Sequence, residues 1–164
     1  MGGFLLINTV FTNTLNNRID SAKKNNNYIT TALSVYADNN QPTYGNLEYL
    51  RVSAIGFAKQ IAGNSDSKIK IGSINELSFS AENEFAHGMS VNSRKSRVVT
   101  ENKKYYIQTI SKIQLVTKSC YIETVDNITS VYSDRDMYCT IYQFILIGVA
   151  LFASILLVNL LKAF

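Results

Sequence analysis

The chain has 164 residues, of which 46% are apolar and 17% charged, with a single proline and a formal net charge of +4. This composition describes one ordered module, and it excludes a disordered tail, a collagen-like repeat and a multidomain enzyme. The basic residues are interleaved with acidic ones and tryptophan is absent, so nucleic acid is not an expected partner.

The first segment, residues 1–12, is apolar but interrupted by Asn8, Thr9 and Thr12. A run of about ten residues is too short to cross a bilayer. It has no Lys or Arg before Arg18, so a cleaved signal peptide is not indicated either. We interpret residues 1–12 as the end of a truncated first transmembrane helix, which makes residues 13–140 a loop between two spans.

A long helix is predicted from this segment to about residue 37, because residues spaced by three and four positions form one stripe. The stripe consists of Leu15, Ile19, Ala22, Asn26, Ile29, Leu33 and Tyr36. It is the candidate surface for dimer contact and signal transmission. Asn26 has two interpretations: it pairs with a like residue and sets the register of a dimer, or it is a solvated position on an imperfect face, which is the favoured one.

The residues that follow predict a second helix and a hairpin. Turn formers fill residues 39–45, and the helical spacing then returns over 47–61. Short alternating runs at residues 69–71 and 77–79, separated by a turn-like tetrad, predict two strands. Residues 81–96 lack periodicity and are expected to form a loop, with Phe85 and Met89 as candidate ligand contacts.

Residues 97–128 are rich in Val, Ile, Tyr and Thr and divide at 101–103 and 117–119, which predicts three antiparallel strands. The expected fold class is therefore α+β, with a long N-terminal helix, a second helix and an antiparallel sheet of about five strands. Ser133, Asp134 and Asp136 form a capping arrangement, so a further helix is expected to begin there.

The last helix is expected to enter a membrane. Residues 141–161 contain no charge, and as a helix they would be about 31 Å long, which matches a hydrocarbon core of about 30 Å. We therefore assign residues 141–162 as a transmembrane helix. Lys162 lies just beyond the uncharged run and agrees with the tendency of positive residues to stay on the cytoplasmic side.

No residues are singled out as catalytic, cofactor-binding or metal-binding. Cys120 and Cys139 lack metal-ligand spacing, and two free thiols are favoured over a disulfide. His87 has no ligand partner at a suitable spacing and is expected to be an ordinary surface residue.

The order of elements and the amino-acid sequence of residues 104–156 resemble those of the extracytoplasmic sensor region and second transmembrane helix of Gram-positive membrane sensor histidine kinases. The similar positions are residues 105–107, 121–125, 126–131 and 134–136, and residues 12–33 resemble the helix that leaves the first span. The resemblance implies a PAS-like or Cache-like fold, a parallel homodimer, and signalling through a kinase core to a cytoplasmic response regulator.

The chain ends at residue 164, so the phosphoacceptor helix and ATP-binding domain of that family lie outside it. We expect no cofactor in this chain, while the full-length parent would be an ATP-dependent histidine kinase. The stimulus, a solute or a neighbouring membrane protein, is open. The alternative is a complete binding or structural protein anchored to the membrane at its C-terminus, without a kinase. A free-standing enzyme is disfavoured, because the chain offers no convergent acid, base and nucleophile.

Overall fold

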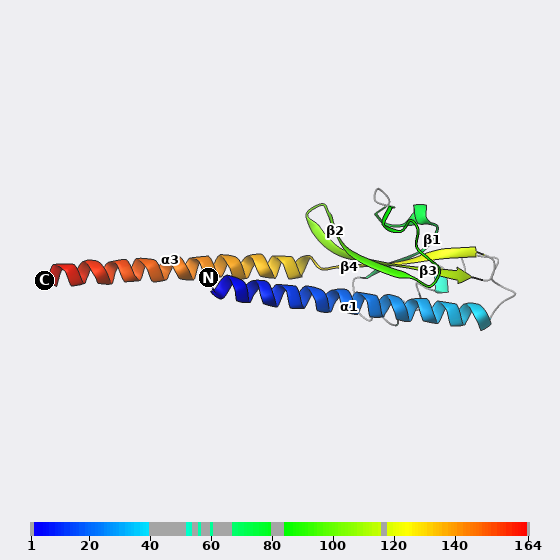
Figure 1. Cartoon of the computed structure of the whole chain (residues 1–164), viewed down its shortest axis with the longest axis horizontal. Coiled ribbons are helices and arrows are strands. Elements are labelled where there is room, and N and C mark those ends of the chain that lie inside the picture. The colour runs from blue at the N-terminus through cyan, green and yellow to red at the C-terminus, as the bar shows by residue number, and fades with distance from the viewer. Residues whose placement is uncertain are drawn as a thin grey trace. The chain divides into compact units, whose positions relative to one another are not determined.

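The structure, a computed structural model, describes residues 2–39, 67–79, 84–115 and 118–163, with single positions at 52, 53, 56 and 60. Its elements are helix α1 (Gly2–Asn39), strand β1 (Lys68–Gly72), the short 3₁₀ helix η2 (Ile74–Glu76), strands β2 (Arg94–Glu101), β3 (Lys104–Leu115) and β4 (Lys118–Asn127), and helix α3 (Thr129–Ala163) (Figure 1). The α+β class is confirmed. The helix expected over residues 47–61 lies outside the described residues, apart from the four single positions.

The chain forms two compact units. The sheet unit comprises Asn16–Thr129, and the helix unit comprises Met1–Leu15 with Ser130–Phe164. Helices α1 and α3 each contribute residues to both units, since the unit boundaries fall inside these helices.

The sheet is antiparallel, with the strand order β1-β4-β3-β2. Strands β2 and β3 form a hairpin in which Glu101 pairs with Lys104. The two residues of its turn, Asn102 and Lys103, have φ values of 50° and 61°. Two consecutive positive φ values are typical of the type I′ turn, whose twist suits a hairpin. The three strands expected over residues 97–128 are thereby confirmed, although β2 begins earlier, at Arg94.

The expected hairpin over residues 69–79 is wrong in its second half. Strand β1 is present, but the chain then turns into η2 and no strand forms at residues 77–79. The Ser73 amide donates to Glu76 Oε2 at 2.6 Å, and the Glu76 amide donates to the Ser73 carbonyl at 3.0 Å. These local bonds replace the strand pairing that residues 73–76 would otherwise need. The described residues therefore form four strands, where about five were expected.

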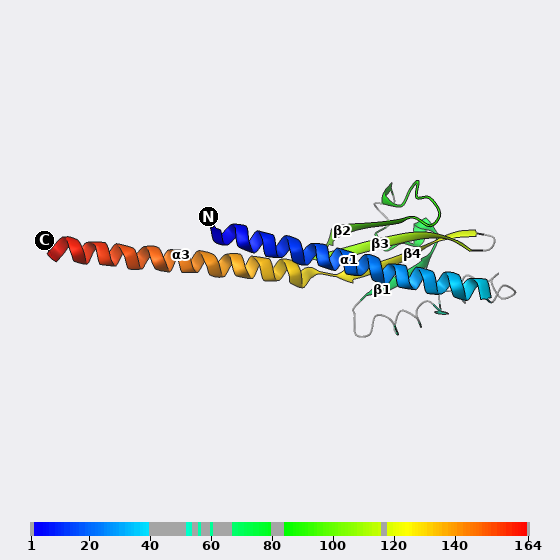
Figure 2. The same ribbon diagram turned by 60° about the horizontal axis from the view of Figure 1, so that its bottom comes forward.

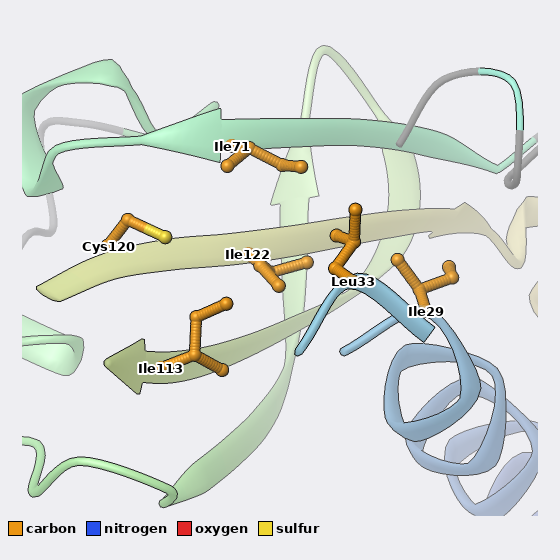
Figure 3. Close-up of a cluster of buried hydrophobic side chains, with 6 residues drawn as sticks. All are labelled: Ile29, Leu33, Ile71, Ile113, Cys120 and Ile122. Carbon is orange, nitrogen blue, oxygen red and sulfur yellow. The ribbon is translucent and has the colours of Figure 1, made fainter. Parts of the chain in front are cut away.

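The second half of α1 packs on one face of the sheet. Figure 3 shows the core of this contact, in which side chains from α1, β1, β3 and β4 meet: Ile29, Leu33, Ile71, Ile113, Cys120 and Ile122. All six are buried. Burial of an aliphatic side chain of this size contributes about 1.5–3 kcal/mol to folding stability. This cluster is therefore the main hydrophobic contact between α1 and the sheet among the described residues.

The opposite face of the sheet is covered by the segment between η2 and β2. Leu77, Ala86 and Met89 from this segment pack on Ile110 of β3. Met89 is only 3% exposed. The expectation that Met89 is an accessible ligand contact is therefore wrong, because a methionine at this position fills the core. No strand forms at residues 77–79 or 84–93, the described parts of this segment, and Leu77, Ala86 and Met89 lie against the sheet.

Helix α3 begins at Thr129, four residues before the expected cap at Ser133. The amide of Thr129 donates to Asn127 Oδ1 at 2.9 Å, so Asn127 provides the side-chain acceptor at the helix start. Ser133, Asp134 and Asp136 are exposed residues within the helix and do not cap it. The Ser-x-x-Asp pattern lies one turn too late, because the bonds at the end of β4 start the helix first.

Helix α3 carries the apolar segment expected to span a membrane. Over Thr129–Lys162 its most apolar window has a mean hydropathy of 2.7, and none of that window is buried. Among the described helices it is the one long and apolar enough to cross a bilayer. An exposed apolar rod is unfavourable in water, which agrees with the expected membrane span.

Replacing Met89 with Ala should lower the free energy of unfolding of the full chain by about 2–5 kcal/mol, because a buried thioether side chain is lost from the core. Val91→Ala is the matched control, since Val91 is 41% exposed and its replacement should change stability by less than about 0.5 kcal/mol. Urea titration of the chain in lipid nanodiscs measures both. Equal, small effects of the two substitutions would contradict the burial of Met89.

Candidate functional site

A polar cluster lies between α1 and the sheet, and Asn26 is at its centre. Asn26 is fully buried. Its amide nitrogen lies 3.3 Å from the Thr109 carbonyl, 3.4 Å from the Ile122 carbonyl and 3.3 Å from Thr124 Oγ1. A side chain from the helix thus bonds to both central strands, β3 and β4.

The carbonyl oxygen of Asn26 is also occupied. It accepts hydrogen bonds from Arg94 Nε at 3.0 Å and from the Ser111 hydroxyl. The interpretation of Asn26 as a solvated position is therefore wrong. Pairing with a like residue in a dimer is also not open to it here, because its own sheet already satisfies both ends of the amide.

The stripe on α1 faces the sheet at the four positions Ala22, Asn26, Ile29 and Leu33, all of which are buried. Leu15 and Ile19 are half-buried. The side chain of Tyr36 lies outside the described residues. The four buried side chains are not available as a dimer surface in this arrangement. The homodimer itself stays a prediction, but it would need another face of the helices.

Arg94 extends the cluster to the end of β2. Its Nε also donates to Ser111 Oγ at 3.0 Å, and its Nη2 donates to Asn27 Oδ1 at 2.7 Å. Burial lowers the pKa of the Arg94 guanidinium from its usual value. A neighbouring cavity of about 260 Å³ is lined by Arg94, by hydroxyl residues such as Thr30 and Ser93, and by no acidic residue. Neutral oxygens therefore hold this charge within the described residues.

Asp126 lies at the opposite end of the same sheet face. Its Oδ1 accepts a hydrogen bond from the Ser67 hydroxyl, while its Oδ2 is buried without a partner in the part of the chain that is described. Desolvation raises the pKa of the Asp126 carboxyl; the hydrogen bond from Ser67 and the positive charge of Arg18 oppose this rise. The carboxyl lines a cavity of about 220 Å³ together with residues of α1, Arg18 among them.

A second cluster of hydrogen-bonded polar side chains lies on the opposite face of the sheet, around Glu123. Gln108 Nε2 donates to Glu123 Oε1 at 2.6 Å, and the Ser78 amide donates to Glu123 Oε2 at 2.8 Å. Arg97 Nε donates to Gln108 Oε1 at 2.7 Å. Glu123 is fully buried. These bonds attach the covering segment to the sheet, since they hold the backbone just after η2 to β4.

Phe85 lies at the edge of that covering segment and is half-buried. The Arg97 guanidinium carbon is 4.5 Å from the centre of its ring, and Lys95 Nζ lies 3.3 Å from its backbone carbonyl. These are cation–π and hydrogen-bond contacts within the chain. The structure separates the two candidate ligand residues: Met89 is in the core, while Phe85 is partly accessible. That Phe85 contacts a ligand stays a prediction.

Within the helix unit, the start of α1 packs antiparallel to the first half of α3, as both views show (Figures 1 and 2). The rings of Phe4 and Tyr142 are 4.8 Å apart, and those of Phe11 and Tyr132 are 5.1 Å apart, both edge to face. A methyl group on Gly3 would overlap the Tyr142 ring, so the close approach there requires glycine or a moved ring.

An apolar groove of about 430 Å³ lies in this helix pair, lined by residues such as Leu6, Val10 and Tyr138. Arg135 stacks on Phe11, with its guanidinium carbon 4.8 Å from the ring centre, and its Nη2 lies 2.7 Å from Asp136 Oδ1. Phe4 and Phe11 therefore pack on α3 before its uncharged run, or at the start of it. The assignment of residues 1–12 to a first span stays a prediction.

The cysteines and the histidine have the properties expected of them. Cys120 and Cys139 are both free thiols, as favoured. Burial raises the pKa of the Cys120 thiol to about 11, which keeps it protonated and unreactive. His87 is exposed. The described residues contain no group of three or more His, Cys, Asp or Glu side chains that could hold a metal ion.

Compared with models of protein families, with curated proteins and with solved structures, the chain matches none.

Among the charged residues of these clusters, Arg94, Glu123 and Asp126 were not predicted as site residues from the sequence. The strand alternation of β4 is a signal for two of them, because it places Glu123 and Asp126 on opposite faces of a sheet that is covered on both sides. The alternation predicts burial of both residues only if it is known that α1 covers one face of the sheet and the segment before β2 covers the other. Arg94 gave no signal, since an arginine at the start of a strand is usually solvated.

Asn26→Ala should lower the free energy of unfolding by about 2–4 kcal/mol, because several buried donors and acceptors would lose their partner at once. Asn17→Ala on the exposed side of α1 is the control and should be close to neutral. Urea titration of the full chain in nanodiscs measures the difference. If the two variants are equally stable, Asn26 is not buried between helix and sheet.

Asp126→Asn should stabilise the chain at neutral pH. Burial raises the folded-state pKa of Asp126 above its ordinary value of 3.8, so the wild type loses stability as the pH rises from that value through the folded pKa. An amide has no charge to desolvate and can still accept the Ser67 bond. The gain should be much smaller at pH 3.5, where the carboxyl is mostly protonated in the unfolded state and more so in the folded state.

Melting temperatures of the full chain at pH 3.5 and pH 7 test this difference. Asp20→Asn is the control, since Asp20 is exposed in a surface ion pair with Lys23 at 3.7 Å and should have little effect. A lower melting temperature of Asp126→Asn at pH 7 would mean that the charged carboxylate is paired in the folded protein.

Proposed function

We propose that this chain is the signal-sensing and transmembrane signal-transmitting part of a two-component sensor histidine kinase whose kinase core lies outside it. In this proposal residues 13–140 are extracytoplasmic and have a PAS-like or Cache-like fold, and residues 141–162 cross the cell membrane. The chain acts as a parallel homodimer and passes its signal to a response regulator through the kinase core.

The observation that carries the proposal is the junction between the sheet and α3. Strand β4 ends at Asn127 and α3 begins at Thr129, so a single residue separates them. The Tyr105 amide of β3 lies 3.0 Å from Thr129 Oγ1, and the Ile128 amide donates to the Tyr105 carbonyl at 2.9 Å. A displacement of β3 or β4 would therefore move the first turn of α3 directly.

Helix α1 supports the same function from the input side. One continuous helix, Gly2–Asn39, contributes Asn26, Ile29 and Leu33 to the sheet core, and it contributes its first residues to the helix unit. A change in how α1 packs on the sheet would thus displace the whole helix, because it is continuous. Packed helix pairs respond to such changes by small shifts or rotations.

The membrane location is supported by α3, whose exposed apolar segment is long enough to cross a bilayer. Thr129 starts the helix and the uncharged run starts at residue 141, so about three helical turns separate the sheet from lipid. A helix of this length without an internal proline can transmit rotation without bending.

Insertions in α3 test the proposal. The chain is fused to the kinase core of a well-studied sensor kinase, and alanine is inserted after Tyr138. One alanine turns everything beyond it by about 100° and should lock or abolish kinase output. Seven alanines restore the original face to within about 20° and should return most of the regulated output.

Phosphate transfer to the response regulator in membranes, with and without the inserted residues, is the measurement. The seven-residue insertion is the matched control for the presence of extra chain. If phosphate transfer is insensitive to both insertions, the chain does not transmit a signal through α3, and an anchored binding or structural protein is favoured.

A further inference from the structure

Asp126, the next-to-last residue of β4, has a carboxyl group of which one oxygen lacks a hydrogen-bond donor. The Ser67 hydroxyl donates to Oδ1. Oδ2 is buried from water, and no described residue donates to it. A charged carboxylate in this position loses its hydration without a replacement, and a buried acid avoids this cost by taking up a proton. The charge of Asp126 therefore depends on how closely its surroundings are packed.

No neighbouring charge neutralises the carboxylate. Arg18 of α1 is the one other charged side chain among the described residues that line the cavity beside Asp126, and no ion pair joins the two. Arg18 is exposed, so water weakens the effect of its charge. Lys68, the first residue of β1, pairs with Val125 and so points to the opposite face of the sheet. The other residues that face the carboxyl from α1 and from the paired position of β3 are uncharged, namely Ser21, Ala22, Asn25 and Ile107.

The position of Asp126 connects it to both long helices. The cavity of about 220 Å³ lies between residues of α1 and the last residues of β4, and it has room for water. A small displacement of α1 away from the end of β4 would bring this water to Oδ2. Asp126 also lies three residues before Thr129, where α3 begins. The hydration of Oδ2 is therefore controlled by a contact of α1 that is adjacent to the start of α3.

We propose that Asp126 is a proton-operated switch between two packings of α1 on the sheet. With the proton bound, the carboxyl is neutral and the closed packing, in which Oδ2 is dry as in this structure, is stable. Without the proton, the carboxylate favours an open packing, in which α1 is displaced at this end and water reaches Oδ2. The proton comes from the solvent and returns to it. Because a ligand shifts an equilibrium when it binds two states unequally, the proton acts as a ligand of the closed packing.

The closed packing should be favoured at acidic pH and the open packing at higher pH. Desolvation raises the pKa of Asp126 in the closed packing above its ordinary value of 3.8, and the hydrogen bond from Ser67 and the charge of Arg18 oppose this rise. The stabilisation by the proton is thus fully present below pH 3.8 and is lost as the pH rises through the pKa of the closed packing. Each unit by which this pKa exceeds that of the open packing changes the equilibrium between the packings about tenfold.

The movement of α1 would act on the residues that start α3, since Asp126 and Thr129 are joined by two residues of backbone. A change in kinase output as a result rests on the proposed sensor function. Proton binding by Asp126 and the displacement of α1 do not depend on that function.

Two measurements on the full chain in neutral lipid nanodiscs test the switch. Carbon-13 NMR of the chain labelled at the aspartate carboxyls gives the titration of Asp126, whose signal is the one that Asp126→Asn removes; its midpoint should lie above 3.8. Hydrogen exchange of the amides of residues 18–25, corrected for the intrinsic effect of pH, measures the opening of α1. Protection should fall between pH 4 and pH 8, by about tenfold for each unit by which the midpoint exceeds the ordinary pKa.

One variant and two controls locate the sensing group. Asp126→Asn keeps the size of the side chain without a charge, so residues 18–25 should be equally protected at pH 4 and pH 8. Asp20→Asn, at an exposed carboxylate of α1, should keep the pH dependence of the wild type. His87→Gln should keep it too, although it removes the single histidine of the chain. Because Asp126→Asn should be at least as stable as the wild type, loss of the pH response in this variant cannot be assigned to unfolding.

Two results would overturn the proposal. One is a midpoint of Asp126 at or below 3.8, which would mean that the folded protein stabilises the charged form. The other is wild-type protection of residues 18–25 that is equal at both pH values, or that changes equally in Asp126→Asn, because protonation would then not control the packing of α1. The kinase fusion tests the sensor function separately: phosphate transfer that does not respond to pH while α1 opens would contradict that function and leave the switch intact.

Discussion

The burial of one amide between a helix and a sheet is the constraint on which the sheet unit depends. Asn26 reaches β3 and β4 with its nitrogen and is reached by Arg94 and Ser111 at its oxygen. An apolar face alone would let α1 slide along the sheet, because hydrophobic contacts are not directional. The amide fixes the position of the helix, since a shift of one turn would leave several buried groups without partners.

On each face of the sheet, the covering layer is attached by an apolar cluster and by hydrogen bonds from buried polar side chains. On the α1 face, apolar contacts around Ile122 stand beside the polar cluster of Asn26. On the other face, Leu77 and Met89 pack on Ile110 while Glu123 holds the backbone of Ser78. Each covering layer is thus held by an apolar cluster and positioned by hydrogen bonds.

Two charged groups on the α1 face have no oppositely charged contact among the described residues. Arg94 is held by neutral oxygens at one end, and Asp126 keeps a buried oxygen without a donor at the other. Both border cavities that α1 helps to line. A layer that was optimised for stability alone would have apolar residues at these places. Their presence agrees with a face whose packing is meant to respond to a bound group, as the proposed sensor role requires.

The α+β class, the three strands over residues 97–128 and the apolar rod of α3 were predictable, because each depends on local periodicity or on the length of an uncharged run. The false strand at residues 77–79 and the late cap at Ser133 show the limit of such patterns. A short alternation or a Ser-x-x-Asp motif occurs in more than one context. The bonds of Ser73 with Glu76, and of Asn127 with Thr129, decided the outcome.

The roles of the buried polar residues depend on partners far away in the sequence. Asn26 stood out in the sequence as an exception on its stripe, but its role depends on Thr109, Ile122 and Arg94, which are 68 to 96 positions away. Asp126 and Arg18 likewise meet at one cavity only after the chain has folded. Most of the helices and strands and the apolar segment of α3 could be predicted, since these properties arise largely between near neighbours. The burial of the polar side chains and the identity of their partners depend on contacts between residues far apart in the chain, so they appear only in the folded protein.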